Sequence, residues 1–225
     1  QQTFTVSTSY QNLLSNSQGN GILDQLIRET FKRLDMDAEM VFSRTDRSLP
    51  DVNAGFFDAE VNRIAGLEEQ YPNLRRVPEP NMTMEFVAFS RRPIEIDGWA
   101  SIRDLDIGIV QGWKILEDNT EGFPHVVTVP TEVQLFEMLS KDRIDIALYA
   151  KLTGYATIIE MGLSGISHLE PPLATREMYL YVHESRAHLV DDIAGALRSV
   201  KADGTYQSIF EEVLRRYGIP SGISW

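Results

Sequence analysis

The sequence predicts an α/β protein made of two lobes. The first observation is a short unit that occurs twice, as LPDVNAGFFDAEVNR over residues 49–63 and as LFEMLSKDRIDIALYAK over residues 135–151. Each copy reads as a short helix, a tight turn and an apolar strand that ends at a basic residue, Arg63 or Lys151. The second observation is that strand and helix patterns alternate in both halves, which is the order of parallel sheets with crossover helices. Because open α/β sheets bind ligands beyond the carboxyl ends of their strands, the pattern favours a protein that closes on a small ligand.

The first lobe has three expected strands, at residues 4–7, 39–43 and 59–64. Apolar residues at helical spacing predict a helix over 22–34, with Asn20 as its candidate cap. A second, shorter helix is expected over 49–54, and Gly55 ends it.

The second lobe repeats this alternation between two strands that cross from one lobe to the other. The crossing strands are expected at 82–90 and 177–183. The strands inside the second lobe are expected at 107–110, 126–129 and 144–148. After the return crossing, two helices at about 187–200 and 205–217 close the chain. Thr131 and Gln134 predict a capping box for the helix that follows them. Lobe 1 is then residues 1–87 and 181–225, lobe 2 is residues 88–180, and both crossing strands act as the hinge.

Composition narrows the possible partners. The 21 basic and 33 acidic residues give a formal charge of -12, which disfavours nucleic acid and anionic membrane surfaces. The absence of cysteine excludes disulfides, thiolate zinc sites and cysteine nucleophiles. The chain starts at Gln1 and soon enters a strand, as a mature secreted chain does after its signal peptide is removed, although a cytoplasmic chain trimmed at this point would look the same. We expect a monomer.

No catalytic motif is present in the sequence. The phosphate-binding, nucleophile-elbow and zinc-protease patterns are all missing. The four histidines show no metal-ligand spacing. We therefore expect no enzyme activity, no metal and no cofactor.

Two basic residues at strand ends are candidate ligand contacts. A guanidinium at the position of Arg63 is suited to gripping a carboxylate, and a cation there is costly to bury unless it meets an anion. The alternative for Arg63 is a structural ion pair with Glu60 or Glu68. Lys151 has the same place in the second lobe, although lysine reaches solvent easily.

Aromatic residues at strand ends are further candidates. Residues 112–114 open a helix after a strand, so their backbone N–H groups favour an anion, with Lys114 beside them and Trp113 as a cover. Tyr10 follows the first strand, and we expect Tyr10 and Trp113 to sandwich the ligand from opposite lobes. Tyr149 is a weaker candidate. For each aromatic residue the alternative is packing in the core. Two aspartates that open strands, Asp58 and Asp145, are expected to serve turns.

Four segments resemble one protein family over nearly the whole chain. They are GFFDA at 55–59, DIGIVQG at 106–112, DRIDIAL at 142–148 and ALRSVKADGTY at 196–206. In this order they are similar to the family 3 extracellular solute-binding proteins, the periplasmic receptors of polar amino-acid ABC importers. The resemblance implies a type II periplasmic-binding-protein fold, a periplasmic location and a membrane permease as partner.

The ligand positions depart from that family. The family's carboxylate-binding Arg falls near Tyr71, its hydroxyl-bearing turn is replaced by residues 65–67, and its ammonium-binding Asp falls near Ala150. These departures argue against a simple amino-acid receptor, and with Arg63 in place of the family's Arg we expect capture of a small, anionic organic solute. Two alternatives remain. One is a sensor-type ligand-binding domain of a membrane receptor, or a relic that binds no ligand. The other is a dehydratase-like enzyme that recruits Glu68, Lys151 or Glu177.

Overall fold

A computed structural model describes residues 3–225, and its contacts divide the chain into two compact units. Unit 1 runs to Thr83 and resumes over Arg176–Tyr217, and unit 2 comprises Met84–Thr175 and Gly218–Trp225. The sequence places the boundaries at 87/88 and 180/181 and assigns the tail to the first lobe. The tail groups with unit 2 instead, because Ile219 is buried and Ser224 hydrogen-bonds Lys151.

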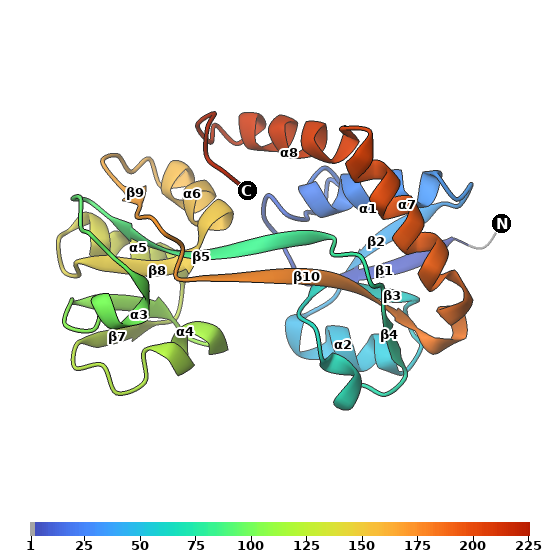
Figure 1. The fold of residues 1–225 in the computed structure, drawn as a ribbon, viewed down its shortest axis with the longest axis horizontal. Helices are drawn as coiled ribbons and strands as arrows, with labels where there is room; N and C mark the ends of the chain where they lie inside the picture. Colours follow the sequence, from blue (N-terminus) through green and yellow to red (C-terminus); the bar gives the residue numbers. More distant parts are fainter. Residues whose placement is uncertain (1–2) are drawn as a thin grey trace. The chain divides into compact units, whose positions relative to one another are not determined.

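Unit 1 contains a parallel sheet with an antiparallel strand beside it (Figure 1). Strand β1 (Phe4–Thr8) lies between β2 (Ala38–Phe42) and β3 (Ala59–Arg63), parallel to both. Strand β10 (Ala174–His183) pairs antiparallel with β3 and with the short β4 (Leu74–Arg76). The carboxyl ends of β1, β2 and β3 therefore share one edge.

The helices of unit 1 are α1 (Ile22–Lys32), α2 (Thr45–Asn53), α7 (Val190–Ala202) and α8 (Thr205–Arg216), with 3-10 turns at Leu67–Glu69 and Glu184–Leu189. Helices α1, α7 and α8 pack on one another, and α2 packs on β1 and β3 (Figure 1). The expected cap at Asn20 is wrong. The cap is Gly21, because the Asp24 carboxylate reaches back to accept the Gly21 N–H at 2.9 Å.

The ALRSVKADGTY segment joins α7 to α8 and fixes both to unit 1. The Lys201 ammonium donates to Glu79 Oε1 and to the Pro80 carbonyl, both at 2.6 Å, and lies 5.6 Å from the centre of the Tyr206 ring. Asp203 accepts the Thr205 N–H at the start of α8 and pairs with Arg33 at the end of α1.

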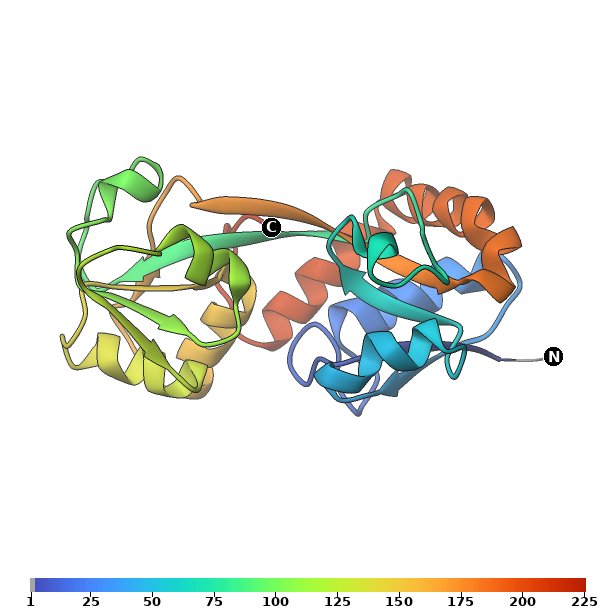
Figure 2. The same ribbon diagram turned by 90° about the horizontal axis from the view of Figure 1, so that it is seen from below.

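Unit 2 repeats the arrangement. Strands β7 (Val126–Val129), β6 (Ile107–Val110) and β8 (Ile146–Ala150) run parallel, β5 (Met82–Ser90) is antiparallel to β8, and β9 (Ser167–His168) pairs with β5. The helices are α3 (Gly98–Ser101), α4 (Lys114–Asn119), α5 (Glu132–Ser140) and α6 (Lys151–Glu160). Helices α5 and α6 pack on each other and on β8 (Figure 2). The N-cap of α5 is confirmed, since Thr131 accepts the Gln134 N–H, but the Gln134 side chain accepts from the Thr131 hydroxyl and not from its N–H, so only half of the expected capping box is present.

Strand β8 lies two residues later than the expected 144–148. Asp145 is held in the preceding turn, where its carboxylate accepts the Asp106 N–H at 2.9 Å. As a result, β8 extends to Ala150 and Lys151 begins α6, a helix that the sequence reading missed. Among the described residues, no helix is long and apolar enough to cross a membrane.

Candidate functional site

A β-bulge shapes the end of β3 in unit 1. Glu60 lies opposite Tyr181 and Arg63 opposite Tyr179, so two residues of β3 face one residue of β10. One of those two, Asn62, has a φ of +64°. Asparagine tolerates this left-handed conformation better than most residues, but the position still departs from ordinary strand geometry. The bulge turns the Asn62 side chain toward Tyr10.

Three polar side chains form a chain of hydrogen bonds at this edge of unit 1. Asn62 Nδ2 donates to the Tyr10 hydroxyl at 3.0 Å, and Asn81 Nδ2 donates to Asn62 Oδ1 at 2.8 Å. Both asparagines are fully buried, and burial raises the pKa of Tyr10 above its usual value. Asn81 Oδ1 accepts no hydrogen bond from the described part of the chain. A buried acceptor without a donor is costly, so this cluster is not arranged for stability alone.

Arg63 is bound to a carboxylate of its own strand. Its Nε and Nη2 both donate to Glu60 Oε1, at 3.0 and 2.7 Å. The Glu60 side chain is 1% exposed and that of Arg63 is 22% exposed. The second Glu60 oxygen accepts the Ser48 hydroxyl, which also contacts the Ser7 hydroxyl at 2.8 Å. The structure therefore contains the ion pair with Glu60 that the sequence left open as the alternative role of Arg63.

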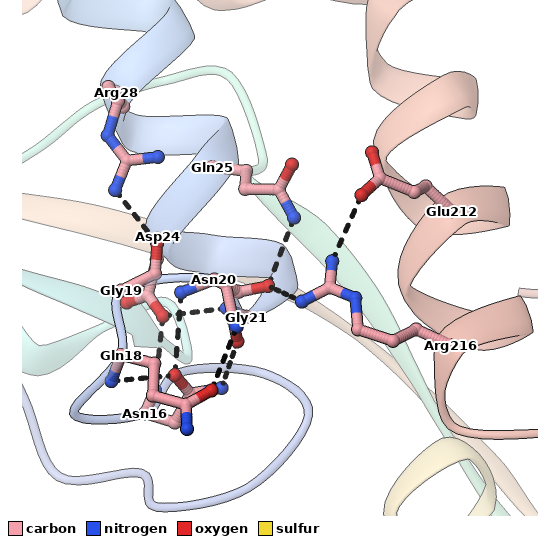
Figure 3. A network of polar contacts seen from close by, with 10 residues as sticks. All are labelled: Asn16, Gln18, Gly19, Asn20, Gly21, Asp24, Gln25, Arg28, Glu212 and Arg216. Atoms are coloured by element: carbon pink, nitrogen blue, oxygen red, sulfur yellow. Dashed lines mark hydrogen bonds and ion pairs between the residues drawn. The ribbon is translucent and has the colours of Figure 1, made fainter.

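A cavity of about 500 Å³ lies beside Tyr10 within unit 1. Hydroxyl and amide side chains line much of it, from Thr8 at the end of β1 and from the loop before α1. That loop is held by a polar network, in which buried Asp24 accepts hydrogen bonds from the Asn16 and Gly21 N–H groups (Figure 3). Asp24 also accepts a hydrogen bond from the Ser15 hydroxyl. Arg216 of α8 adds a hydrogen bond to the Asn20 carbonyl (Figure 3). The network gives the cavity a fixed wall.

Lys151 lies at the carboxyl end of β8 in unit 2, as expected, but its side chain is only 2% exposed. Its ammonium contacts the Glu85 carboxylate and lies 2.9 Å from the Ser224 hydroxyl. The cation is therefore paired inside unit 2.

Trp113 and Tyr149 lie together at the same edge of unit 2. The centres of their rings are 5.2 Å apart, and Trp113 also meets the Phe86 ring at 5.5 Å. Phe86 and Tyr149 are buried, whereas Trp113 is half-buried. Trp113 thus packs partly on the core and keeps part of its ring accessible to a solute.

The expected anion site at residues 112–114 already holds an acidic group of the chain. The Gly112 N–H donates to Glu117 Oε1 at 2.7 Å. Lys114 is exposed.

Within each unit some of the residues expected at a ligand edge lie close together. Tyr10 lies beside Asn62 in unit 1, next to Arg63, and Trp113 contacts Tyr149 in unit 2. The joint role of Tyr10 and Trp113 stays a prediction, because they belong to different units. The expected structural roles of two aspartates are confirmed, since Asp58 accepts the Thr5 N–H and Asp145 the Asp106 N–H.

The sequence predictions of site residues did not include four polar residues of these edges: Asn62, Asn81, Glu85 and Glu117. Glu60 was expected only as an alternative partner of Arg63, and the structure contains that pair. Asn62 and Asn81 meet at a bulge, Glu85 reaches Lys151 through the register between β5 and β8, and Glu117 lies in the short helix α4. Hydrophobic periodicity shows none of these features.

No family model matches the chain. An uncharacterized protein of Shewanella oneidensis is 23% identical over 166 residues, which are 69% of this chain and 62% of that protein. The chain thus spans less than two thirds of that relative.

Solved structures are similar over almost the full length. The L-cystine solute receptor of Neisseria gonorrhoeae has a TM-score of 0.75 at 19% identity, covering 94% of this chain and 92% of that one. The second substrate-binding domain of a putative amino acid ABC transporter from Streptococcus pneumoniae has a TM-score of 0.74 at 17% identity, covering 95% and 100%. A histidine kinase sensor domain with similarity to periplasmic binding proteins has a TM-score of 0.72 at 18% identity, covering 95% and 96%. The α/β fold class and the resemblance expected from the sequence are confirmed: the chain has the fold of the periplasmic solute-binding proteins.

Proposed function

We propose that this protein captures a small polar solute at the carboxyl ends of its parallel strands and does not transform it. The observation that carries this proposal is the Tyr10–Asn62–Asn81 cluster. It combines a bulge, a left-handed asparagine and a buried acceptor without a donor. Such departures from stable geometry concentrate at functional sites.

The solute is expected to be released to a membrane permease of an ABC importer, with the protein acting in the periplasm after removal of a signal peptide. The likeness to substrate-binding domains of importers supports this assignment. The fold also occurs in a histidine kinase sensor domain, so the second candidate is a ligand-binding domain that reports the solute to a membrane receptor.

The experiment is a thermal-shift screen of amino acids, dicarboxylates, keto acids, polyamines, sugars and amides. A true ligand raises the melting temperature, because binding to the folded state alone stabilises it. Uptake of the labelled solute then separates the two roles, since loss of the gene abolishes uptake only if the protein serves an importer.

Asn62→Gly is the decisive variant. Glycine accepts the left-handed backbone without strain, so the variant keeps the fold and loses the amide. We expect lost solute binding, together with a fall in stability of about 1–3 kcal/mol, because Asn81 Nδ2 and the Tyr10 hydroxyl lose their buried partner. Unchanged binding would make Asn62 a purely structural residue and would remove the observation on which the proposal rests.

A further inference from the structure

Each of the three positions at which the sequence predicts an anion holds a carboxylate of the chain itself. Arg63 binds Glu60, Lys151 binds Glu85, and the Gly112 N–H binds Glu117. We infer that the captured solute is uncharged and is recognised by hydrogen bonds, as a polyol or a primary amide is. This inference rests on the proposed solute capture and names the class of solute.

Glu60 is unable to move aside for an anionic ligand. One of its oxygens holds Arg63, the other holds the Ser48 hydroxyl, and its side chain is 1% exposed. An anion at Arg63 would share the guanidinium with a fixed negative charge a few ångströms away. Like charges at such distances in a partly buried place repel strongly.

Lys151 is also unavailable to an anionic ligand, because two groups of unit 2 already contact its ammonium. Its ammonium contacts the Glu85 carboxylate and the Ser224 hydroxyl, and its side chain is 2% exposed. A buried ammonium is stable because it is paired, and an anionic solute would have to displace that internal partner.

The third position, the Gly112 N–H before α4, is also occupied by a carboxylate of the chain, although the group that binds it there is a backbone N–H and not a cation. Glu117 already accepts the Gly112 N–H, at 2.7 Å. The neighbouring Lys114 is exposed, and a solvated surface charge attracts an anion only weakly.

The side chains that remain beside Tyr10 are mainly neutral donors and acceptors. Thr8, Gln11 and Ser17 line the cavity there, and Asn62 supplies its amide to the Tyr10 hydroxyl. Hydroxyl and amide groups can match both the donors and the acceptors of an uncharged solute. Arg28 also lines the cavity, but it donates to the Gly19 carbonyl and is accompanied by the carboxylates of Asp24 and Glu39, so the lining offers an anion no surplus of positive charge.

The first test asks whether the three positions accept an anion, and it needs no knowledge of the natural solute. The full ¹⁵N-labelled chain is titrated with malonate and, separately, with malonamide, while the signals of the Gly112 amide, the Arg63 Nε–H and the Lys151 ammonium are followed. We expect no saturable malonate shift in the unaltered protein. In Glu117→Ala, which releases the Gly112 N–H, malonate should shift the Gly112 signal. The malonate concentration needed should be at least about tenfold lower than any at which the signal moves in the unaltered protein. Saturable malonate binding at Arg63, Lys151 or Gly112 of the unaltered chain would overturn the inference.

The second test uses matched pairs in the thermal-shift screen, each an amide or polyol with its carboxylate twin. We expect the uncharged member of a stabilising pair to bind at least about tenfold more tightly, which is about 1.4 kcal/mol. A carboxylate or a polyamine that binds more tightly than every uncharged solute would overturn the assignment of solute class but leave solute capture intact. If no solute of any charge stabilises the protein, solute capture itself fails, and the malonate titration still shows whether the three positions are closed.

Discussion

Arg63 donates two hydrogen bonds to a single oxygen of Glu60, a carboxylate that is almost completely buried. The first role of Arg63 is therefore to neutralise the buried Glu60 carboxylate. A residue three positions away in a regular strand points to the opposite face of the sheet. The two side chains meet because the bulge at Asn62 resets the alternation.

Removing Arg63 is therefore expected to destabilise the fold. Arg63→Ala leaves the Glu60 charge buried without its cation, and we expect the free energy of unfolding in urea to fall by about 1–3 kcal/mol. Arg75→Ala is the matched control, because the Arg75–Glu184 pair is exposed, and it should cost less than about 1 kcal/mol. Equal effects of the two substitutions would contradict the structural role of Arg63.

The sequence predicted the elements of both units well, because apolar alternation and helical spacing depend on neighbouring residues. Strands β6 and β7 have the bounds that were expected, and the tail motif marked the junction of α7 and α8. Periodicity does not record a bulge, so the direction of the Asn62 side chain was beyond it, and the Glu60–Arg63 pair could be given only as one of the alternative roles of Arg63. The Glu85–Lys151 pair depends on the register between β5 and β8, which only the folded chain defines.

Two helical glycines give opposite predictions for the same substitution. A Cβ on Gly154 of α6 would lie 2.5 Å from Cε2 of the Phe89 ring, a core side chain. Gly154→Ala should therefore lower stability by about 1–3 kcal/mol through overpacking. Gly195→Ala on α7 meets nothing within 4 Å and should raise stability by about 0.5–1 kcal/mol. The free energy of unfolding of both variants is measured in urea. A stabilised Gly154→Ala protein would show that Gly154 does not lie against the Phe89 ring.

Acid should weaken the start of α8 through Asp203. Hydrogen bonds from Thr205, together with Arg33, lower the pKa of Asp203 from 3.8 to about 2. Because the pKa is lower in the folded state, the stabilisation is present above pH 3.8 and is lost as the pH falls through about 2. We expect Asp203→Asn to flatten this part of the stability–pH curve, measured by thermal unfolding between pH 5 and 2. An identical curve for the variant would rule out the contribution of Asp203.

Trp113 should report solute binding. It is half-buried against Phe86 and Tyr149, so a solute at this edge changes the surroundings of its ring. We expect a solute found in the screen to change tryptophan fluorescence and Trp113→Phe to remove most of that change. Trp99→Phe is the control and should keep it. A full signal in the Trp113→Phe protein would place Trp113 outside the binding surface.

The most direct measurement of the central claim is calorimetric titration of the best-stabilising solute into the unaltered protein, Asn62→Gly and Asp142→Gly. Asp142 also has a left-handed backbone, with a φ of +53°, and lies in the turn after α5 in unit 2. Solute capture at the Tyr10–Asn62–Asn81 cluster predicts binding to the unaltered protein and to Asp142→Gly, and at least about a tenfold loss of affinity in Asn62→Gly. Equal affinity in all three proteins would contradict it.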